Sequence, residues 1–100
     1  MAHRKEEEMD SRKAELFEKA QSALRILEET VVDLLRLHPH GLTNREVTTE
    51  LGLESDQDGE QENYLSWSVL GRLMKAGNVL RKTVEQPGKK AKRSVYKLSE

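Results

Sequence analysis

The sequence predicts a small, mainly helical α+β domain, in which three helices are followed by a two-stranded antiparallel ribbon. Three observations carry this prediction. Apolar residues recur at three- and four-residue spacing from residue 16 to residue 35, and residues 62–75 repeat that spacing. Near the C-terminus, two alternating segments flank a basic loop. One hundred residues are enough for one such domain.

The composition excludes several classes of protein. There is no cysteine, which excludes a disulfide scaffold, thiolate zinc ligands and a cysteine nucleophile. No apolar run approaches the ~18 residues of a membrane span, and the polar N-terminus lacks the apolar region of a signal peptide. We therefore expect an intracellular protein, in the nucleus or the cytoplasm, that does not act on a membrane.

The first helix is predicted from its periodic apolar residues, which are Leu16, Phe17, Ala20, Leu24, Leu27, Val31, Leu34 and Leu35. No glycine or proline interrupts this run before Pro39, so it forms either one long helix or a helix with a loose joint near residues 21–22. We expect residues 1–10 to be a flexible N-terminus, residues 11–22 a helical extension and residues 23–100 the domain. The extension could pack on the domain or on a second copy, which would make a homodimer.

Turn and capping signals follow the first helix. Residues 38–41, HPHG, end it, because proline disfavours helical geometry in the preceding residue and glycine opens the turn. The two histidines of this turn have no third ligand in view, so we predict no metal site. Thr43 and Glu46 have the spacing of a capping box, which predicts a short second helix that ends at Gly52.

An acidic segment connects the second helix to the third. From Glu46 to Glu62 the chain has seven acids and no base. Acids alternate beside Gly59, but their spacing does not match a calcium loop of the EF-hand type. We expect a solvated loop over residues 54–60, with its acids near the positive end of the next helix dipole.

Residues 62–75, closed by Gly77, predict the helix around which the other elements are organised. At about 100° per residue, one side is apolar and should face the core. Its members are Leu65, Val69, Leu70 and Leu73. The opposite side has Tyr64, Ser68, Gly71 and Lys75, with Trp67 and Arg72 at its edges. Trp67 is either exposed for binding or folded over the edge of the core against the first helix.

The C-terminal part of the chain is predicted to be a basic ribbon. Residues 79–84 and 94–98 have the character of strands, with Tyr96 and Leu98 facing inward, and they are joined by the turn-rich loop EQPGKKAKR. Residues 72–100 have a net charge of +7, whereas residues 1–71 have a net charge of −8. This division indicates one basic working surface.

This order of elements resembles the winged-helix family over residues 23–98. The resemblance rests on TNREVTTELGL as the second helix, NYLSWSVLGRLMKAGNV as the third helix with its turn, and VLRKTV and SVYKLS as the wing strands. Leu42 looks like the stub of the family's small first strand. The resemblance implies a three-helix core with a C-terminal β-hairpin wing, here with an N-terminal extension of the first helix. Winged helices commonly bind DNA through the third helix and the wing, while others bind RNA or proteins.

We therefore expect a non-catalytic nucleic-acid-binding domain, with DNA ahead of RNA, that needs no cofactor. The expected binding residues lie on the wing and on the outer face of the third helix: Tyr64, Trp67, Ser68, Arg72, Lys75, Arg81, Lys82, Lys89, Lys90, Lys92 and Arg93. Their cations would neutralise phosphates, and the two aromatic side chains could stack on bases or anchor a protein. The sequence has no Gly-rich phosphate loop, metal triad or nucleophile elbow, so we expect no enzymatic activity.

Two other hypotheses stay open. The protein could be an interaction module within a larger complex, using the acidic region 46–62 and the exposed aromatics. Glu60 and Glu62 favour this hypothesis, because they would repel phosphates at the start of the third helix. The basic sequence KKAKR could instead be a nuclear-import signal or only keep the protein soluble.

Overall fold

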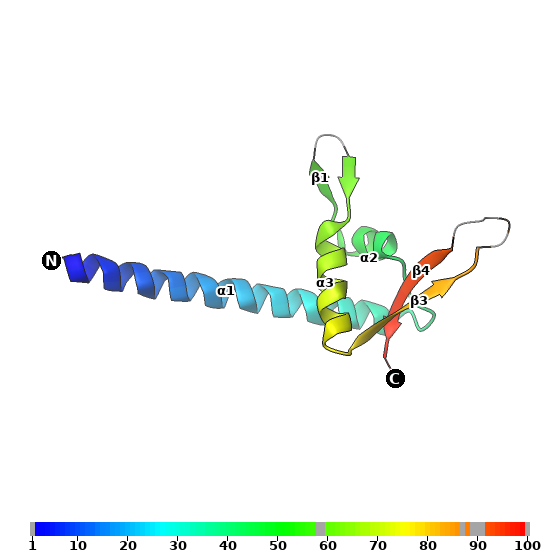
Figure 1. Ribbon diagram of the computed structural model, residues 1–100, viewed down its shortest axis with the longest axis horizontal. Helices are drawn as coiled ribbons and strands as arrows, with labels where there is room; N and C mark the ends of the chain where they lie inside the picture. Colours follow the sequence, from blue (N-terminus) through cyan, green and yellow to red (C-terminus); the bar gives the residue numbers. More distant parts are fainter. Residues whose placement is uncertain (1, 58–59, 87, 89–91, 100) are drawn as a thin grey trace.

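The computed structural model describes residues 2–57, 60–86, 88 and 92–99, with side chains from residue 10 onward except those of residues 55–62. Its elements are α1 (Ala2–Arg36), α2 (Asn44–Leu51), β1 (Ser55–Gln57), β2 (Glu60–Glu62), α3 (Tyr64–Lys75), β3 (Val79–Val84) and β4 (Arg93–Leu98) (Figure 1). The predicted small, mainly helical α+β fold, with three helices and a C-terminal antiparallel hairpin, is confirmed.

Helix α1 is continuous, without a joint near residues 21–22, and it begins at Ala2, well before the periodic pattern starts. Only its C-terminal third packs on the other elements, and the rest projects from them (Figure 1). The molecule is consequently elongated, with extents of 71 × 37 × 19 Å. Within α1, Val31 and Leu35 are fully buried. The division into a flexible start, an extension and a domain stays a prediction.

The capping box of α2 is confirmed. The Glu46 backbone N–H donates to Thr43 Oγ1 at 3.1 Å, and the Thr43 N–H donates to Glu46 Oε1 at 2.9 Å. At the other end, Gly52 has a left-handed φ of 65°, which brings the Leu53 N–H to 2.9 Å from the Thr48 carbonyl. Both ends of this short helix are therefore satisfied by residues within and directly beside it.

The predicted acidic loop is wrong, because residues 55–57 and 60–62 pair as a second antiparallel hairpin. Its register pairs Gln57 with Glu60, so two residues connect the strands. They are Asp58 and Gly59, and Asp-Gly is a strong signal for a two-residue hairpin connection. That local signal outweighs the polar composition. Because β2 extends to Glu62, α3 begins at Tyr64 rather than at residue 62.

The side of α3 that is buried is rotated about the helix axis relative to the predicted side. Val69, Leu70 and Leu73 are buried as expected, but Leu65 is 45% exposed and Ser66 is fully buried in its place. A serine can occupy the core because neighbouring polar groups satisfy its hydroxyl. The helix ends where the Asn78 N–H donates to the Leu73 carbonyl at 2.9 Å, and this turn includes Gly77.

Strands β3 and β4 form the C-terminal hairpin, with Val79 opposite Leu98 and Val84 opposite Arg93. Tyr96 is buried as predicted, and it also pairs with Leu42 through two backbone hydrogen bonds of 2.7 and 2.9 Å. The order at this edge is therefore Leu42, β4, β3. Leu98 is partly buried against the core.

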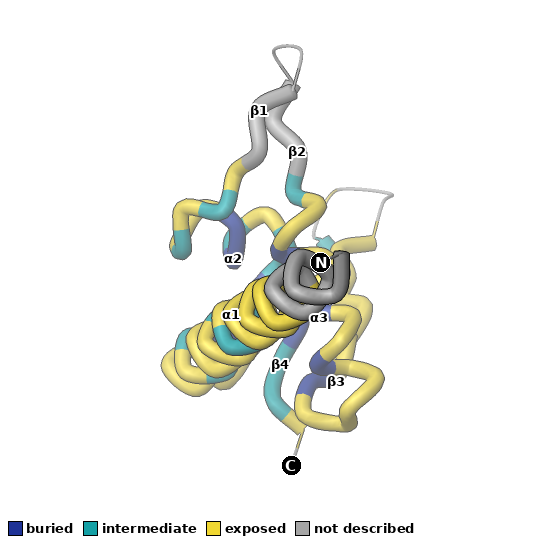
Figure 2. The backbone as a smooth tube through the Cα atoms, turned by 90° about the vertical axis from the view of Figure 1, so that its left-hand side faces the viewer, coloured by how far each residue is buried: buried dark blue, intermediate teal, exposed yellow. Residues whose placement is uncertain are grey.

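The core lies where the end of α1, α2, α3 and the C-terminal hairpin meet. Its buried members are Val31, Leu35, Leu42, Val47, Val69, Leu70, Leu73, Val79 and Tyr96. Figure 2 shows buried segments at this junction and mostly exposed backbone along the described part of the projecting α1. Among the described residues, no helix combines the length and apolar character needed to cross a membrane.

Candidate nucleic-acid interface

A buried polar network holds α2 against α3 and so sets the position of the outer face of α3. The Ser66 hydroxyl donates to Asn44 Oδ1 at 2.6 Å and is in hydrogen-bond contact with the Thr48 hydroxyl. The Asn44 amide donates to the Asn63 carbonyl at 3.2 Å. Ser66 and Thr48 are both fully buried. Sequence reasoning missed this network, because its members are small polar residues that lie far apart in the chain.

The two aromatic residues predicted for binding lie together at the start of α3. Tyr64 is 63% exposed and Trp67 is 59% exposed, so Trp67 does not fold over the edge of the core. With Asn44 and Asn63 they line a shallow hollow of about 310 Å³. Ser68 is also exposed on this helix. The hollow therefore offers aromatic surface beside amide donors and acceptors.

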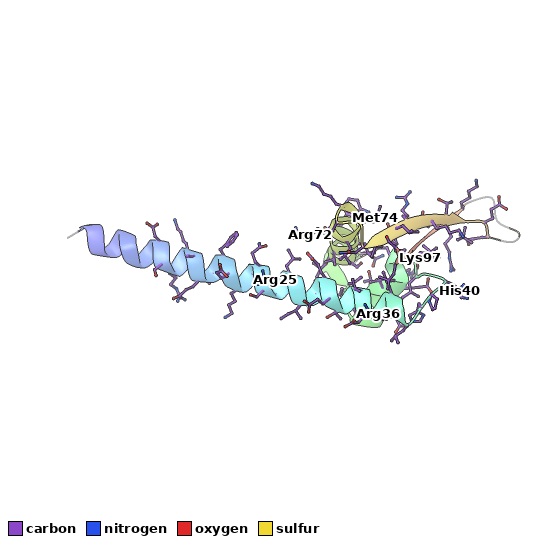
Figure 3. All side chains as sticks on the ribbon, turned by 90° about the horizontal axis from the view of Figure 1, so that it is seen from below. Arg25, Arg36, His40, Arg72, Met74 and Lys97 are labelled. Carbon is purple, nitrogen blue, oxygen red and sulfur yellow. The ribbon has the colours of Figure 1, made fainter. Side chains whose placement is uncertain are left out.

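Arg72 is less available for binding than predicted. Its Nε lies 2.8 Å from Glu28 Oε1, an ion pair that joins α3 to α1. Figure 3 shows Arg72 and Met74 on opposite sides of α3, with Arg72 towards the projecting part of α1. Lys75, at the end of α3, is exposed. Arg72 and Lys75 are three residues apart, so they lie on the same side of α3, and together with Glu28 and Ala76 they line one shallow hollow.

The register of the C-terminal hairpin separates its cations into two groups. Residues that alternate along a strand, and their cross-strand partners, share a face of the sheet. Lys82, Arg93 and Lys97 therefore lie on one face, and Arg81 lies on the other with Tyr96. Sequence reasoning omitted Lys97 from the site, although the period of two in β4 could have found it. Lys92 is exposed, and Lys89 and Lys90 lie outside the described residues.

Arg93 also contacts the capping box of α2. Its guanidinium nitrogen lies 3.9 Å from Glu46 Oε1. The hydrogen bond from the Thr43 backbone N–H holds the pKa of Glu46 below its usual range. Partial burial raises this pKa, but a smaller lowering effect comes from each of three further groups, the Thr43 hydroxyl, Arg93 and His38. An open groove of about 660 Å³ separates α2 from this end of the hairpin. It is lined by Thr43, Arg45, Glu46, Thr49, Glu50, Gln86 and Arg93.

Charge differs between the two ends of α3. The acidic hairpin β1–β2 extends beyond its N-terminal end, and the basic hairpin β3–β4 follows its C-terminal end (Figure 1). Within the described part of the chain, no three histidine, aspartate or glutamate side chains gather as a metal site requires. No protein-family model matches the chain, and no curated protein or solved structure is significantly similar to it.

Proposed function

We propose that this chain is a winged-helix domain that binds nucleic acid without catalysing a reaction, with DNA ahead of RNA. The order of α1, the Leu42 strand, α2, α3 and the β3–β4 hairpin supports the winged-helix assignment. The observation that carries the functional proposal is the cationic face of the hairpin, formed by Lys82, Arg93 and Lys97. Cations placed along one surface neutralise successive phosphates and release counterions.

In the proposed mode of binding, the β3–β4 hairpin makes the main contacts with the phosphates, and the N-terminal end of α3 does not. The acids of residues 54–62 would repel phosphates at that end of the helix. Lys75, at the other end of α3, adds a cation four residues before β3 begins. Arg72 contributes less than Lys75, because Glu28 already neutralises it.

The test is a titration of the protein with a mixed-sequence DNA duplex and with single-stranded RNA, at low and moderate salt, by fluorescence anisotropy. The test variant is Lys82→Gln with Lys97→Gln. The control is Arg25→Gln with Arg36→Gln, which removes the same charge from exposed positions of α1 (Figure 3). We expect the hairpin variant to bind more weakly and its log K to depend on log salt less steeply, by about 2 in the slope. The control should match the wild type.

Absence of binding to either ligand at low salt would refute the proposal, as would equal losses in the hairpin and control variants. If RNA binds more tightly than DNA, the protein is still a nucleic-acid-binding domain, but its ligand is RNA. NMR shifts of the backbone amides in β3 and β4 that fade as salt rises would map the surface.

A second candidate function is a protein-interaction module, and the exposed aromatic hollow supports it. Tyr and Trp are common anchors of protein interfaces, and the acids of residues 54–62 would suit a basic partner. Trp67 is the single tryptophan, so its fluorescence reports on this hollow directly. If DNA binds without changing Trp67 emission while Trp67→Ala keeps the full affinity, the hollow is free for a protein.

A further inference from the structure

The side of α1 that packs on the domain continues past the domain towards the N-terminus. Six residues of α1 are buried in the core or packed against it, namely Leu24, Leu27, Val31, Val32, Leu34 and Leu35. At about 100° per residue, these six occupy a sector roughly 160° wide. Leu16, Phe17 and Ala20 fall within the same sector. The apolar stripe is therefore one surface, of which the domain covers only the C-terminal part.

The uncovered part of this stripe is open to solvent. Leu16 is 54% exposed and Phe17 is 65% exposed, and every residue from 10 to 20 is exposed. The stripe belongs to the projecting part of α1 (Figures 1 and 2). Most of the stability of a helix in a protein comes from packing of its apolar face, and this segment has no such packing within the described chain.

Leu65 of α3 is a further exposed apolar residue. It lies two turns before Arg72 and so on the same side of α3, because seven residues complete about two turns. That side is in contact with α1, since Arg72 is paired with Glu28, and Figure 3 shows Arg72 on the side of α3 towards the projecting part of α1. Leu65 is 45% exposed. A partner helix on the α1 stripe would therefore end against Leu65.

The charges of this segment indicate the kind of partner. Between residues 10 and 23 there are three acids and three bases, so the segment has no net charge. Nucleic acid or an anionic membrane would select a segment with a net positive charge, which this segment lacks. A second copy offers an identical apolar stripe of the same length, always at equal concentration, and meets no net electrostatic repulsion.

We propose that residues 10–23 of α1 pair with the same segment of a second copy, with Leu16, Phe17 and Ala20 at the centre of the interface and Leu65 at its edge. The dimer does not depend on nucleic-acid binding. The cationic hairpin variant should therefore still dimerise, and the dimer variant should keep the hairpin intact.

Sedimentation equilibrium of the full chain over a wide range of concentration tests the proposal. The test variant is Leu16→Glu with Phe17→Glu. The matched control is Ser11→Glu with Ile26→Glu, which adds two charges to the opposite, exposed side of the same helix. We expect the wild type and the control to dimerise and the test variant to stay monomeric. Leu65→Ser should weaken the dimer at least several-fold.

Circular dichroism provides a second readout, because these substitutions lie on exposed residues and leave the core unchanged. Dilution of the wild type should lower its helical signal as the projecting segment loses its partner. The test variant should have the low signal at every concentration and keep the thermal transition of the domain. A wild type that is monomeric at about 1 mM, or a control that loses dimerisation as the test variant does, would overturn the proposal.

Discussion

At the scale of single residues, the capping box of α2 couples folding to pH. Hydrogen bonding from Thr43 holds the pKa of Glu46 below its ordinary value, and Arg93 adds to this. A carboxyl group with a lower pKa in the folded state binds fewer protons there. Its contribution to stability is therefore present above the ordinary pKa of glutamate, about 4.3, and is lost as the pH falls through the folded value.

The test compares Glu46→Gln with the wild type, because glutamine keeps the acceptor and removes the charge. We expect the wild type to be the more stable at pH 7, and the difference in unfolding free energy to shrink below about pH 4.3. Urea unfolding at a series of pH values measures it. A difference that stays constant down to complete protonation of Glu46 would contradict this coupling.

Ser66 gives a second prediction at the residue scale. Ser66→Ala would leave Asn44 Oδ1 and the Thr48 hydroxyl each without one partner in a buried site. The expected cost is about 1–3 kcal/mol of unfolding free energy. Ser68→Ala is the matched control on the exposed side of α3 and should change stability by no more than about 0.5 kcal/mol. Equal changes in unfolding free energy for the two variants would show that the hydrogen bonds of Ser66 do not stabilise the fold.

At the scale of elements, two glycines should respond in opposite directions to alanine. Gly71 lies inside α3, and an added Cβ would meet nothing within 4 Å, so Gly71→Ala should stabilise the protein by about 0.5–1 kcal/mol. Gly41 has a φ of 91°, and an added Cβ would lie 2.9 Å from the Tyr96 carbonyl oxygen. Gly41→Ala should destabilise it by at least about 1–2 kcal/mol. Thermal unfolding of both variants checks the signs, and a stabilising Gly41→Ala would contradict the close approach to β4.

At the scale of the whole molecule, the end of α1 belongs to the core rather than to the projecting arm. Leu35 is 1% exposed and Leu37 is 76% exposed. Leu35→Ala should therefore cost about 2–5 kcal/mol, whereas Leu37→Ala should stay within about 0.5 kcal/mol. Chemical denaturation measures both. A small effect of Leu35→Ala would mean that the domain folds without α1.

Sequence reasoning was most accurate where a few neighbouring residues decide the structure. The capping box of Thr43 and Glu46 and the left-handed Gly52 were found because their hydrogen bonds span only three or four residues. The acidic composition of residues 54–60 predicts a loop, whereas the turn signal Asp58-Gly59 is the feature that agrees with the observed β1–β2 pairing. The alternation within β4 places Lys97 on the same face as Arg93, but only the pairing of the strands places both with Lys82.

By itself, the sequence determined the three helices, the C-terminal hairpin and the separation of acids from bases, since periodicity, capping and charge are local properties. Only the tertiary structure decided which side of α3 is buried, because Ser66 is satisfied by Asn44, 22 residues away. It also decided that Arg72 is paired, since Glu28 lies 44 residues away in the chain. Such contacts depend on how the helices pack, and packing depends on every element at once.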